Sequence, residues 1–219
     1  MTDLPGNPPH IIFESRSLKK TFDRRVIFRD LNLSITNRES LAITGRNGTG
    51  KSTLIKILAN VLSQSSGSIE LKINGKPIER GDFYKYIGFV SPYLNLYDEF
   101  TGYENLRFVT RVRGIQSELI DPVLRKVGLY DRRNDTVKIY SSGMKQRLKI
   151  AFAIIHKPLI LLLDEPTSNL DSQGIEIIDM IAEEYKKDYI LVIATNDEHE
   201  RSLCRKEINL NQPEGKENT

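Results

Sequence analysis

A glycine-rich segment in the first quarter of the chain has the residue types and spacing of a phosphate-binding loop. Residues 45–52 read GRNGTGKS and match the pattern G-x-x-x-x-G-K-[ST], between an apolar strand pattern and a helical pattern. The glycines allow backbone N–H groups to curve around phosphate oxygens, and the following helix N-terminus adds a favourable partial charge. We therefore expect a nucleotide here, with Lys51 at the β- and γ-phosphates and the Ser52 hydroxyl on Mg²⁺. The predicted nucleotide-binding residues are Gly45, Arg46, Asn47, Gly48, Thr49, Gly50, Lys51, Ser52 and Thr53.

Two adjacent carboxylates follow a second apolar run. Residues 159–163 read LILLL, which is typical of a strand buried on both faces, and Asp164 and Glu165 come directly after it. Ligands of open α/β sheets bind at the carboxyl ends of the strands. Asp164 suits a role in holding Mg²⁺ together with Ser52, and Glu165 suits a role in orienting or deprotonating an attacking water. The alternative is a pair of turn acids, but the phosphate loop in the same chain favours the catalytic interpretation.

A small polar segment lies upstream of these carboxylates. Residues 140–147 read YSSGMKQR. At a helix start, Ser141, Ser142 and Gly143 would offer backbone N–H groups and a hydroxyl to a second anion. Taken alone, the segment favours a simple helix N-cap.

Together these motifs resemble, in their order along the chain, those of the nucleotide-binding subunits of ABC transporters. Residues 140–146 look like the LSGGQ signature of that family, and residues 166–171, PTSNLD, look like its D-loop. Phe22 occupies the position of the aromatic side chain that stacks on adenine. Residues 96–97 and 101–106 resemble the stretch that follows the family's Q-loop. The resemblance covers nearly the whole chain.

This resemblance implies an ATPase that works as a head-to-tail dimer. ATP and Mg²⁺ would be the cofactors, and ATP would lie between Lys51 of one subunit and Ser141, Ser142, Gly143 and Gln146 of the other. It also implies a separate transmembrane permease as partner, with this subunit peripheral on the cytoplasmic face of the membrane. The short chain resembles export-type subunits, with the heme-exporter and ABC-2 groups as the nearest likenesses.

The chain departs from the family pattern at two positions. Pro92 stands where the Q-loop glutamine is expected, and proline offers no side-chain group to Mg²⁺ or water. Asn196 stands where the switch histidine is expected; asparagine can hydrogen-bond to a γ-phosphate but cannot titrate. His199 would point away along a helix, so we predict Asn196 as the catalytic residue of this segment. We expect ATP hydrolysis that is slow but real, because Lys51, Ser52, Asp164 and Glu165 are retained.

Strand and helix patterns alternate, which predicts an α/β fold with a mainly parallel sheet. Strands are expected over residues 11–19, 26–35, 40–44, 68–73, 87–90, 159–163 and 189–194, and helices over 51–62, 103–113, 117–127, 143–156 and 175–186. Residues 93–140 have no central strand and are expected to form an inserted helical subdomain. The resemblance adds a P-loop ABC ATPase core with an N-terminal antiparallel β subdomain. We predict one domain over residues 10–211, with residues 1–9 and 212–219 disordered.

Composition excludes several classes of protein. The chain has 219 residues, of which 28% are charged and 39% hydrophobic, so it can bury a sizeable core. The longest apolar runs have six residues, whereas a membrane span needs about 20. A net charge of +3 is too small to argue for nucleic acid as a partner. The single cysteine, Cys204, cannot form an internal disulfide, which fits a reducing compartment.

Three other functions remain open at this point. A non-transport ABC ATPase of translation or DNA repair usually has two ATPase units or long coiled coils, and neither is seen here. A partly degenerate regulatory subunit of a heterodimer would explain Pro92 and Asn196, but not the retained Glu165. A P-loop kinase or GTPase would leave the signature unexplained. Finally, the aromatic side chains of Tyr93, Tyr97, Phe100 and Tyr103 are expected either to dock a permease or to pack inside the helical subdomain.

Overall fold

A five-stranded parallel sheet lies at the centre of the computed structural model, which describes residues 8–211. Its order is β6-β7-β8-β3-β9, and all four pairings are parallel. The strands are β3 (Ser40–Thr44), β6 (Ile87–Val90), β7 (Ile160–Asp164), β8 (Ile190–Ala194) and β9 (Lys206–Asn209). Their carboxyl ends therefore meet at one edge, where the residues following β3, β7 and β8 come together.

The inner strands are buried on both faces because successive apolar side chains join two different cores. In β7, Ile160 and Leu162 belong to the core that includes the second sheet and α1 (Lys51–Leu58). Leu161 and Leu163 belong to the core that includes α4 (Ser142–Ile154) and α5 (Ser172–Asp188). This two-sided burial explains the unbroken apolar runs in the sequence.

The second sheet is antiparallel and has the order β2-β1-β4-β5. It consists of β1 (Ile11–Phe22), β2 (Arg25–Thr36), β4 (Ser66–Ile73) and β5 (Lys76–Ile78). Asn74 and Gly75 join the last two strands, and both have left-handed backbone angles (φ 51° and 76°) as a two-residue hairpin requires. The predicted antiparallel β subdomain is thereby confirmed.

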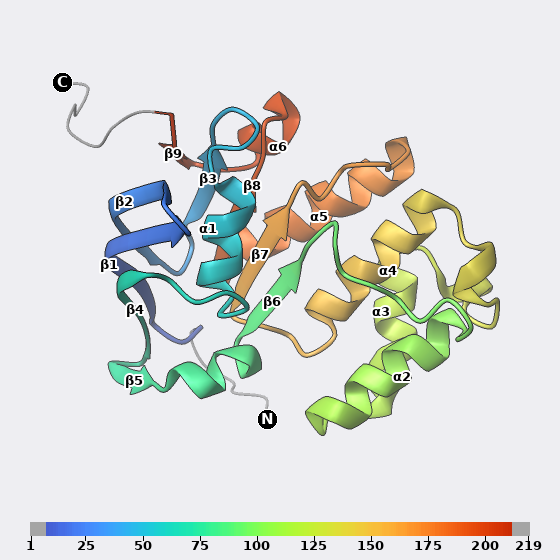
Figure 1. The fold of residues 1–219 in the computed structure, drawn as a ribbon. Coiled ribbons are helices and arrows are strands. Elements are labelled where there is room, and N and C mark those ends of the chain that lie inside the picture. The colour runs from blue at the N-terminus through green and yellow to red at the C-terminus, as the bar shows by residue number, and fades with distance from the viewer. Residues whose placement is uncertain (1–7, 212–219) are drawn as a thin grey trace.

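The remaining helices lie in different parts of the molecule, and the last of them contacts β3. They are α2 (Gly102–Arg113), α3 (Ile120–Lys126) and the short α6 (Glu198–Ser202), with 3-10 helices at Arg80–Lys85, Ser117–Leu119, Tyr130–Arg132 and Val137–Ile139. Figure 1 shows α2 and α3 (green to yellow) at the opposite end from β1 and β2 (blue). An ion pair between Lys126 and Glu184 ties α3 to α5.

The structure confirms the predicted fold class but shifts several boundaries. The helix predicted over residues 51–62 ends at Leu58, because Asn60 adopts a left-handed conformation (φ 58°) that stops it. The prediction omitted β5, β9 and α6. Residues 1–7 and 212–219, part of the segments predicted to be disordered, lie outside the described residues. Within residues 8–211, no helix combines the length and apolar character that crossing a membrane requires.

Candidate active site

The loop between β3 and α1 has the backbone geometry of a phosphate cradle. Gly45, Gly48 and Gly50 all have φ in the left-handed range, at 139°, 84° and 105°. At Gly50 a side chain would also overlap the Ile27 side chain of β2, so that only glycine fits. These glycines therefore allow a tight turn between β3 and the first residue of α1.

Lys51 closes this loop with its own side chain. Its Nζ donates to the carbonyl of Gly45 at 2.8 Å and to that of Arg46 at 3.4 Å, and the residue is only 6% exposed. Burial lowers the pKa of Lys51, while the carboxylates of Glu165 and Asp164 act in the opposite direction. An ammonium group held on two carbonyls and near two carboxylates is well placed to exchange those carbonyls for phosphate oxygens.

Ser52 and Asp164 meet beside this lysine. The Ser52 hydroxyl donates to Oδ1 of Asp164 at 3.0 Å, joining the start of α1 to the end of β7. Asp164 is 1% exposed, and its Oδ2 is buried without a hydrogen-bond partner in the described part of the chain. Burial raises the pKa of Asp164, with Glu165 contributing in the same direction and Ser52 opposing it. A buried carboxylate with one unsatisfied oxygen, next to a hydroxyl, fits a hard divalent cation that keeps several other ligands.

Glu165 follows directly and has a strained backbone. Its φ of 48° lies in the left-handed region, which a residue with a side chain enters only at a cost. Its N–H donates to the carbonyl of Ala194 at 3.0 Å, and its own carbonyl accepts from the N–H of Ser168 at 3.3 Å. The side chain is half-buried. The loop thus holds Glu165 in an unusual conformation at the carboxyl edge of the sheet.

Asn196 lies against the phosphate loop, as expected for a residue that follows β8. Its Nδ2 donates to Oδ1 of Asn47 at 2.6 Å, and its side chain is exposed. His199 instead contacts Asp179 of α5 at 2.8 Å. The structure brings Asn196, but not His199, to the loop.

Phe22 lies at the end of β1 and is 45% exposed. It pairs with Arg25 of β2, and Ile27, two residues further along β2, contacts the loop at Gly50. The Lys20 ammonium lies 4.6 Å from the centre of the Phe22 ring. An exposed aromatic face at this end of the hairpin is available for stacking on a base.

The predicted signature segment begins α4 on the far side of β6 and β7 (Figure 1). Ser141 is the N-cap, since its Oγ accepts from the N–H of Met144 at 3.2 Å, which confirms the capping interpretation. Ser141 and Ser142 are both exposed. A side chain at Gly143 would come within 3.1 Å of the carbonyl oxygen of Asn169, in the loop that follows Glu165.

Gln146 is placed differently from the other signature residues. It is buried, and its Nε2 donates to the carbonyl of Pro166 at 3.1 Å. Its amide therefore links α4 to the loop after β7 and is not among the groups that the structure exposes to a nucleotide.

Pro92 is exposed and lies two residues past the end of β6. Its carbonyl accepts a hydrogen bond from Nζ of Lys149 on α4 at 2.7 Å. On the next residue, the Tyr93 ring lies 4.5 Å from Nζ of Lys56 on α1. Two lysines from different helices thus hold the segment where the family has its glutamine.

Glu200 is a buried acid that the sequence analysis missed. It lies on α6 and accepts hydrogen bonds from Thr167 in the loop after Glu165. The available signal was the spacing of Asp197 and Glu200, which fits an N-cap followed by an acid three residues later and predicts a short helix here. Nothing in the sequence indicated that Glu200 is buried.

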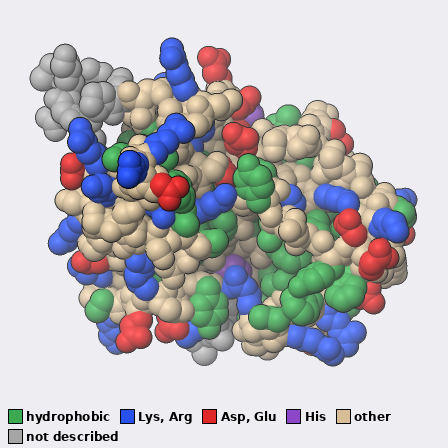
Figure 2. Space-filling model, in the orientation of Figure 1, with side chains coloured by type: hydrophobic (Ala, Val, Ile, Leu, Met, Phe, Trp, Pro, Cys, Tyr) green, Lys and Arg blue, Asp and Glu red, His purple; other side chains and the backbone are tan. Residues whose placement is uncertain are grey.

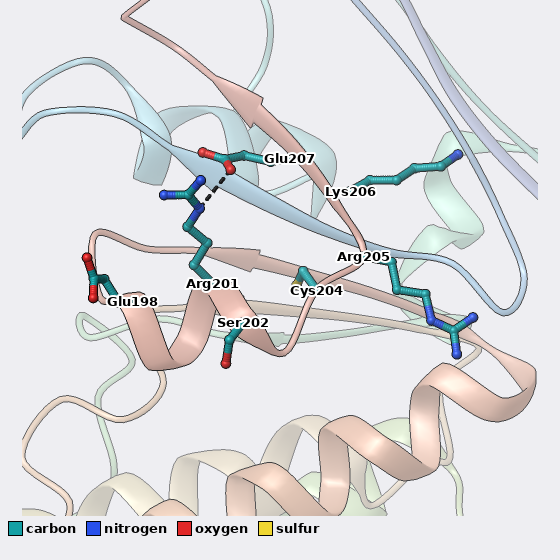
Figure 3. Close-up of a pocket in the computed structure, with 7 residues that line it drawn as sticks. All are labelled: Glu198, Arg201, Ser202, Cys204, Arg205, Lys206 and Glu207. Carbon is teal, nitrogen blue, oxygen red and sulfur yellow. Dashed lines mark ion pairs between the residues drawn. The ribbon is translucent and has the colours of Figure 1, made fainter.

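A cavity of about 360 Å³ lies beside α6 and β9 (Figure 3). The side chains that line it are mostly charged, and an ion pair between Arg201 and Glu207 crosses it at 2.7 Å. None of the predicted nucleotide-binding or catalytic residues lines this cavity.

The fold and the loop geometry define a P-loop nucleoside triphosphatase. Residues 28–168 match the family described as ABC transporter. The chain is 38% identical over 181 residues to the lantibiotic transport ATP-binding protein SrtF of Streptococcus pyogenes, which covers 83% of this chain and 78% of SrtF. It is 32% identical over 168 residues to the bacitracin transport ATP-binding protein BcrA of Enterococcus faecalis, covering 76% of this chain and 54% of BcrA. The structure matches the dimeric ATP-binding cassette MJ0796 bound to ADP and Pi with a TM-score of 0.78 and 25% identity, covering 90% of this chain and 93% of that one.

The chain therefore belongs to the ABC transporter family. It is an ATP-binding subunit of that family and an ATPase.

Proposed function

We propose that this chain hydrolyses Mg-ATP in a head-to-tail dimer and energises a separate membrane permease on the cytoplasmic side, in the direction of export. The observation that carries the proposal is the contact between Ser52 and Asp164 beside Lys51 and Glu165. These groups form one polar cluster at the carboxyl edge of the sheet, where a triphosphate on the loop would end.

In this proposal the chain's own residues supply positioning, charge and a base. Lys51 would leave the carbonyls of the loop and donate to the β- and γ-phosphate oxygens. Ser52 and Asp164 would hold Mg²⁺, which when bound neutralises charge on the phosphates. Glu165 would take the proton of the attacking water, and Asn196 would donate its amide N–H to the γ-phosphate. Phosphoryl transfer is largely positioning and charge stabilisation, and these residues would supply one half of the site.

The second half of the site would come from another subunit. Ser141 and Ser142 are exposed at the start of α4, away from the phosphate loop of their own chain (Figure 1). Backbone N–H groups and a hydroxyl at a helix N-terminus favour an anion such as the γ-phosphate. A head-to-tail dimer would place them on the ATP held by the other copy. The dimeric relative with a similar fold supports this arrangement.

An apolar surface next to the Pro92 segment supports the permease as partner. Tyr93 is 75% exposed, and Tyr97, Phe100 and Phe108 also expose their rings, whereas Tyr103 packs partly buried against the core. Figure 2 shows hydrophobic side chains gathered over the segment after β6 and over α2. Clustered exposed aromatic side chains are typical of protein contacts. We infer that membrane-embedded subunits dock here. SrtF and BcrA are named for transport of a lantibiotic and of bacitracin, which supports a transport role.

The test is an affinity purification of the tagged chain from gently solubilised membranes, with co-purifying proteins identified by mass spectrometry. A multi-span partner at equal stoichiometry is expected. Ribosomal or DNA-bound partners without a membrane protein would contradict the proposal and favour a non-transport ATPase. A Tyr97→Ser/Phe100→Ser variant is the matched control, since it should lose the partner and keep ATP hydrolysis.

A further inference from the structure

The short helix α6 carries a buried carboxylate that has no part in the mechanism above. Glu200 is 1% exposed. Its Oε1 accepts hydrogen bonds from the N–H of Thr167 at 2.7 Å and from the hydroxyl of Thr167 at 2.6 Å. Its Oε2 is buried without a hydrogen-bond partner in the described residues. Burying a carboxylate costs free energy. Both hydrogen bonds to the Glu200 carboxylate come from Thr167, which indicates that the carboxylate has a specific role in holding this threonine.

That threonine belongs to the loop that holds Glu165. Thr167 lies two residues after Glu165, whose φ of 48° is strained. The hydrogen bond from the N–H of Ser168 to the Glu165 carbonyl closes the turn between them at 3.3 Å. A strained conformation persists only where surrounding contacts over-determine it. The two bonds from Thr167 to Glu200 are the shortest side-chain contacts on this turn.

We propose that Glu200 is a positioning residue for ATP hydrolysis, which fixes Thr167 and through it the backbone that presents Glu165 to the γ-phosphate. This inference rests on the proposed role of Glu165 as the base. The same helix begins at its N-cap Asp197, immediately after Asn196. One short helix therefore sets the position of both predicted γ-phosphate contacts.

Other contacts hold α6 in place independently of Glu200. His199 contacts Asp179 of α5 at 2.8 Å. Arg201 pairs with Glu207 of β9 at 2.7 Å, and Figure 3 shows this pair side by side between α6 and β9. Because these neighbours anchor the helix, substitution of Glu200 should release the loop and leave α6 where it is.

The test compares steady-state ATP hydrolysis by purified Glu200→Ala, Glu200→Gln and His199→Gln variants of the full chain, with thermal melting measured in parallel. Glu200→Ala should lower kcat by about 10- to 100-fold and change KM for ATP less than about twofold, since a misplaced catalytic group costs rate rather than ground-state binding. Glu200→Gln keeps an acceptor oxygen for both Thr167 donors and should recover most of the rate. His199→Gln removes a neighbouring contact of the same helix and should retain the parental kcat.

Glu200→Ala with parental kcat, or an equal loss of kcat in His199→Gln, would overturn the inference. If Glu200→Ala does not fold, Thr167→Val supplies the test, because it removes the hydroxyl donor and retains the backbone N–H. That variant should lower kcat several-fold without changing KM, and an unchanged kcat would again overturn the inference. Glu165→Gln in the same assay tests the proposed function separately. If the parent chain hydrolyses ATP and Glu165→Gln hydrolyses it as fast, then Glu165 does not have the role on which the inference rests.

Discussion

The phosphate loop and the signature segment differ in how far their polar groups are buried and hydrogen-bonded within their own chain. At the phosphate loop, Lys51 and Asp164 are buried; Lys51 is bonded to a carbonyl of the loop, and Asp164 at the end of β7 is bonded to Ser52 of α1. At the signature segment, Ser141 and Ser142 are exposed, and Ser141 caps only its own helix. Gln146, about one turn into α4, is buried against the loop after β7.

This difference shows how the two regions would share one reaction. We expect the phosphate loop to bind ATP in a single chain, because Lys51, Ser52 and Asp164 are already held in place by their own contacts. The signature segment is a helix start, where the first N–H groups have no partner within the helix and would be available to an anion on another subunit. Binding should therefore depend on the first region and hydrolysis on both.

Replacing Glu165 should have the largest effect and should separate binding from chemistry within the phosphate-loop region. We expect Glu165→Gln to bind Mg-ATP like the parent and to lower kcat by about 10²- to 10⁴-fold, the usual contribution of a general base. Fluorescent ATP-analogue titration and a phosphate-release assay measure the two effects. Glu176→Gln, an exposed glutamate of α5, is the matched control and should hydrolyse ATP at the parental rate. Unchanged turnover by Glu165→Gln would remove it from the mechanism.

His156 lies past the C-terminal end of α4, the helix that begins with the signature segment. It is buried just past α4, and its Nε2 lies 3.1 Å from the Ile87 carbonyl of β6. Burial, with a smaller effect of the Arg113 charge, lowers its pKa from 6.5 to about 4. Above pH 6.5 the ring is neutral in both states. Between pH 6.5 and about 4, the ring takes up a proton in the unfolded chain and stays neutral in the folded one. The free energy of unfolding should therefore fall by about 3 kcal/mol in total across this range.

Urea unfolding at pH 7, 5.5 and 4.5 measures this loss. His156→Gln should flatten the pH dependence over this range. Equal slopes for the parent and His156→Gln would show that another group is responsible.

Ser141→Asp distinguishes the capping role of the signature from its proposed contact with ATP. Aspartate is as good an N-cap as serine, so the melting temperature should not fall. Its negative charge would oppose the γ-phosphate of the other subunit, and kcat should drop by about tenfold or more, while ATP binding to the single chain stays unchanged. Ser117→Asp, at another exposed helix start, should match the parent. Parental kcat in Ser141→Asp would mean that the segment is only a cap.

Asn196→Ala should have the smallest effect of the series. The variant loses one neutral hydrogen bond to the γ-phosphate, so we expect a kcat about three- to tenfold lower with unchanged ATP affinity. In the structure the same amide donates to Asn47, so the variant also loses this bond. Hydrolysis as fast as the parent with equal ATP binding would show that Asn196 is not a γ-phosphate donor.

The parts of this site that sequence reasoning located are those set by local geometry. A glycine turn between a strand and a helix, and two acids after an apolar strand, need no knowledge of the rest of the fold. Contacts between distant segments carry no such pattern. The burial of Glu200 depends on where α6 lands against the loop after β7, and the bond from Lys149 to Pro92 depends on how α4 packs beside β6. The orientation of Gln146 was missed for the same reason.

The most direct test of a site shared by two subunits is the solution mass of the Glu165→Gln chain, measured by light scattering with and without Mg-ATP. Because this variant should retain ATP, the mass should correspond to one chain without nucleotide and to two chains with it. Adding Ser141→Asp should return it to one chain at saturating ATP. A single-chain mass for Glu165→Gln with ATP bound would contradict the head-to-tail arrangement.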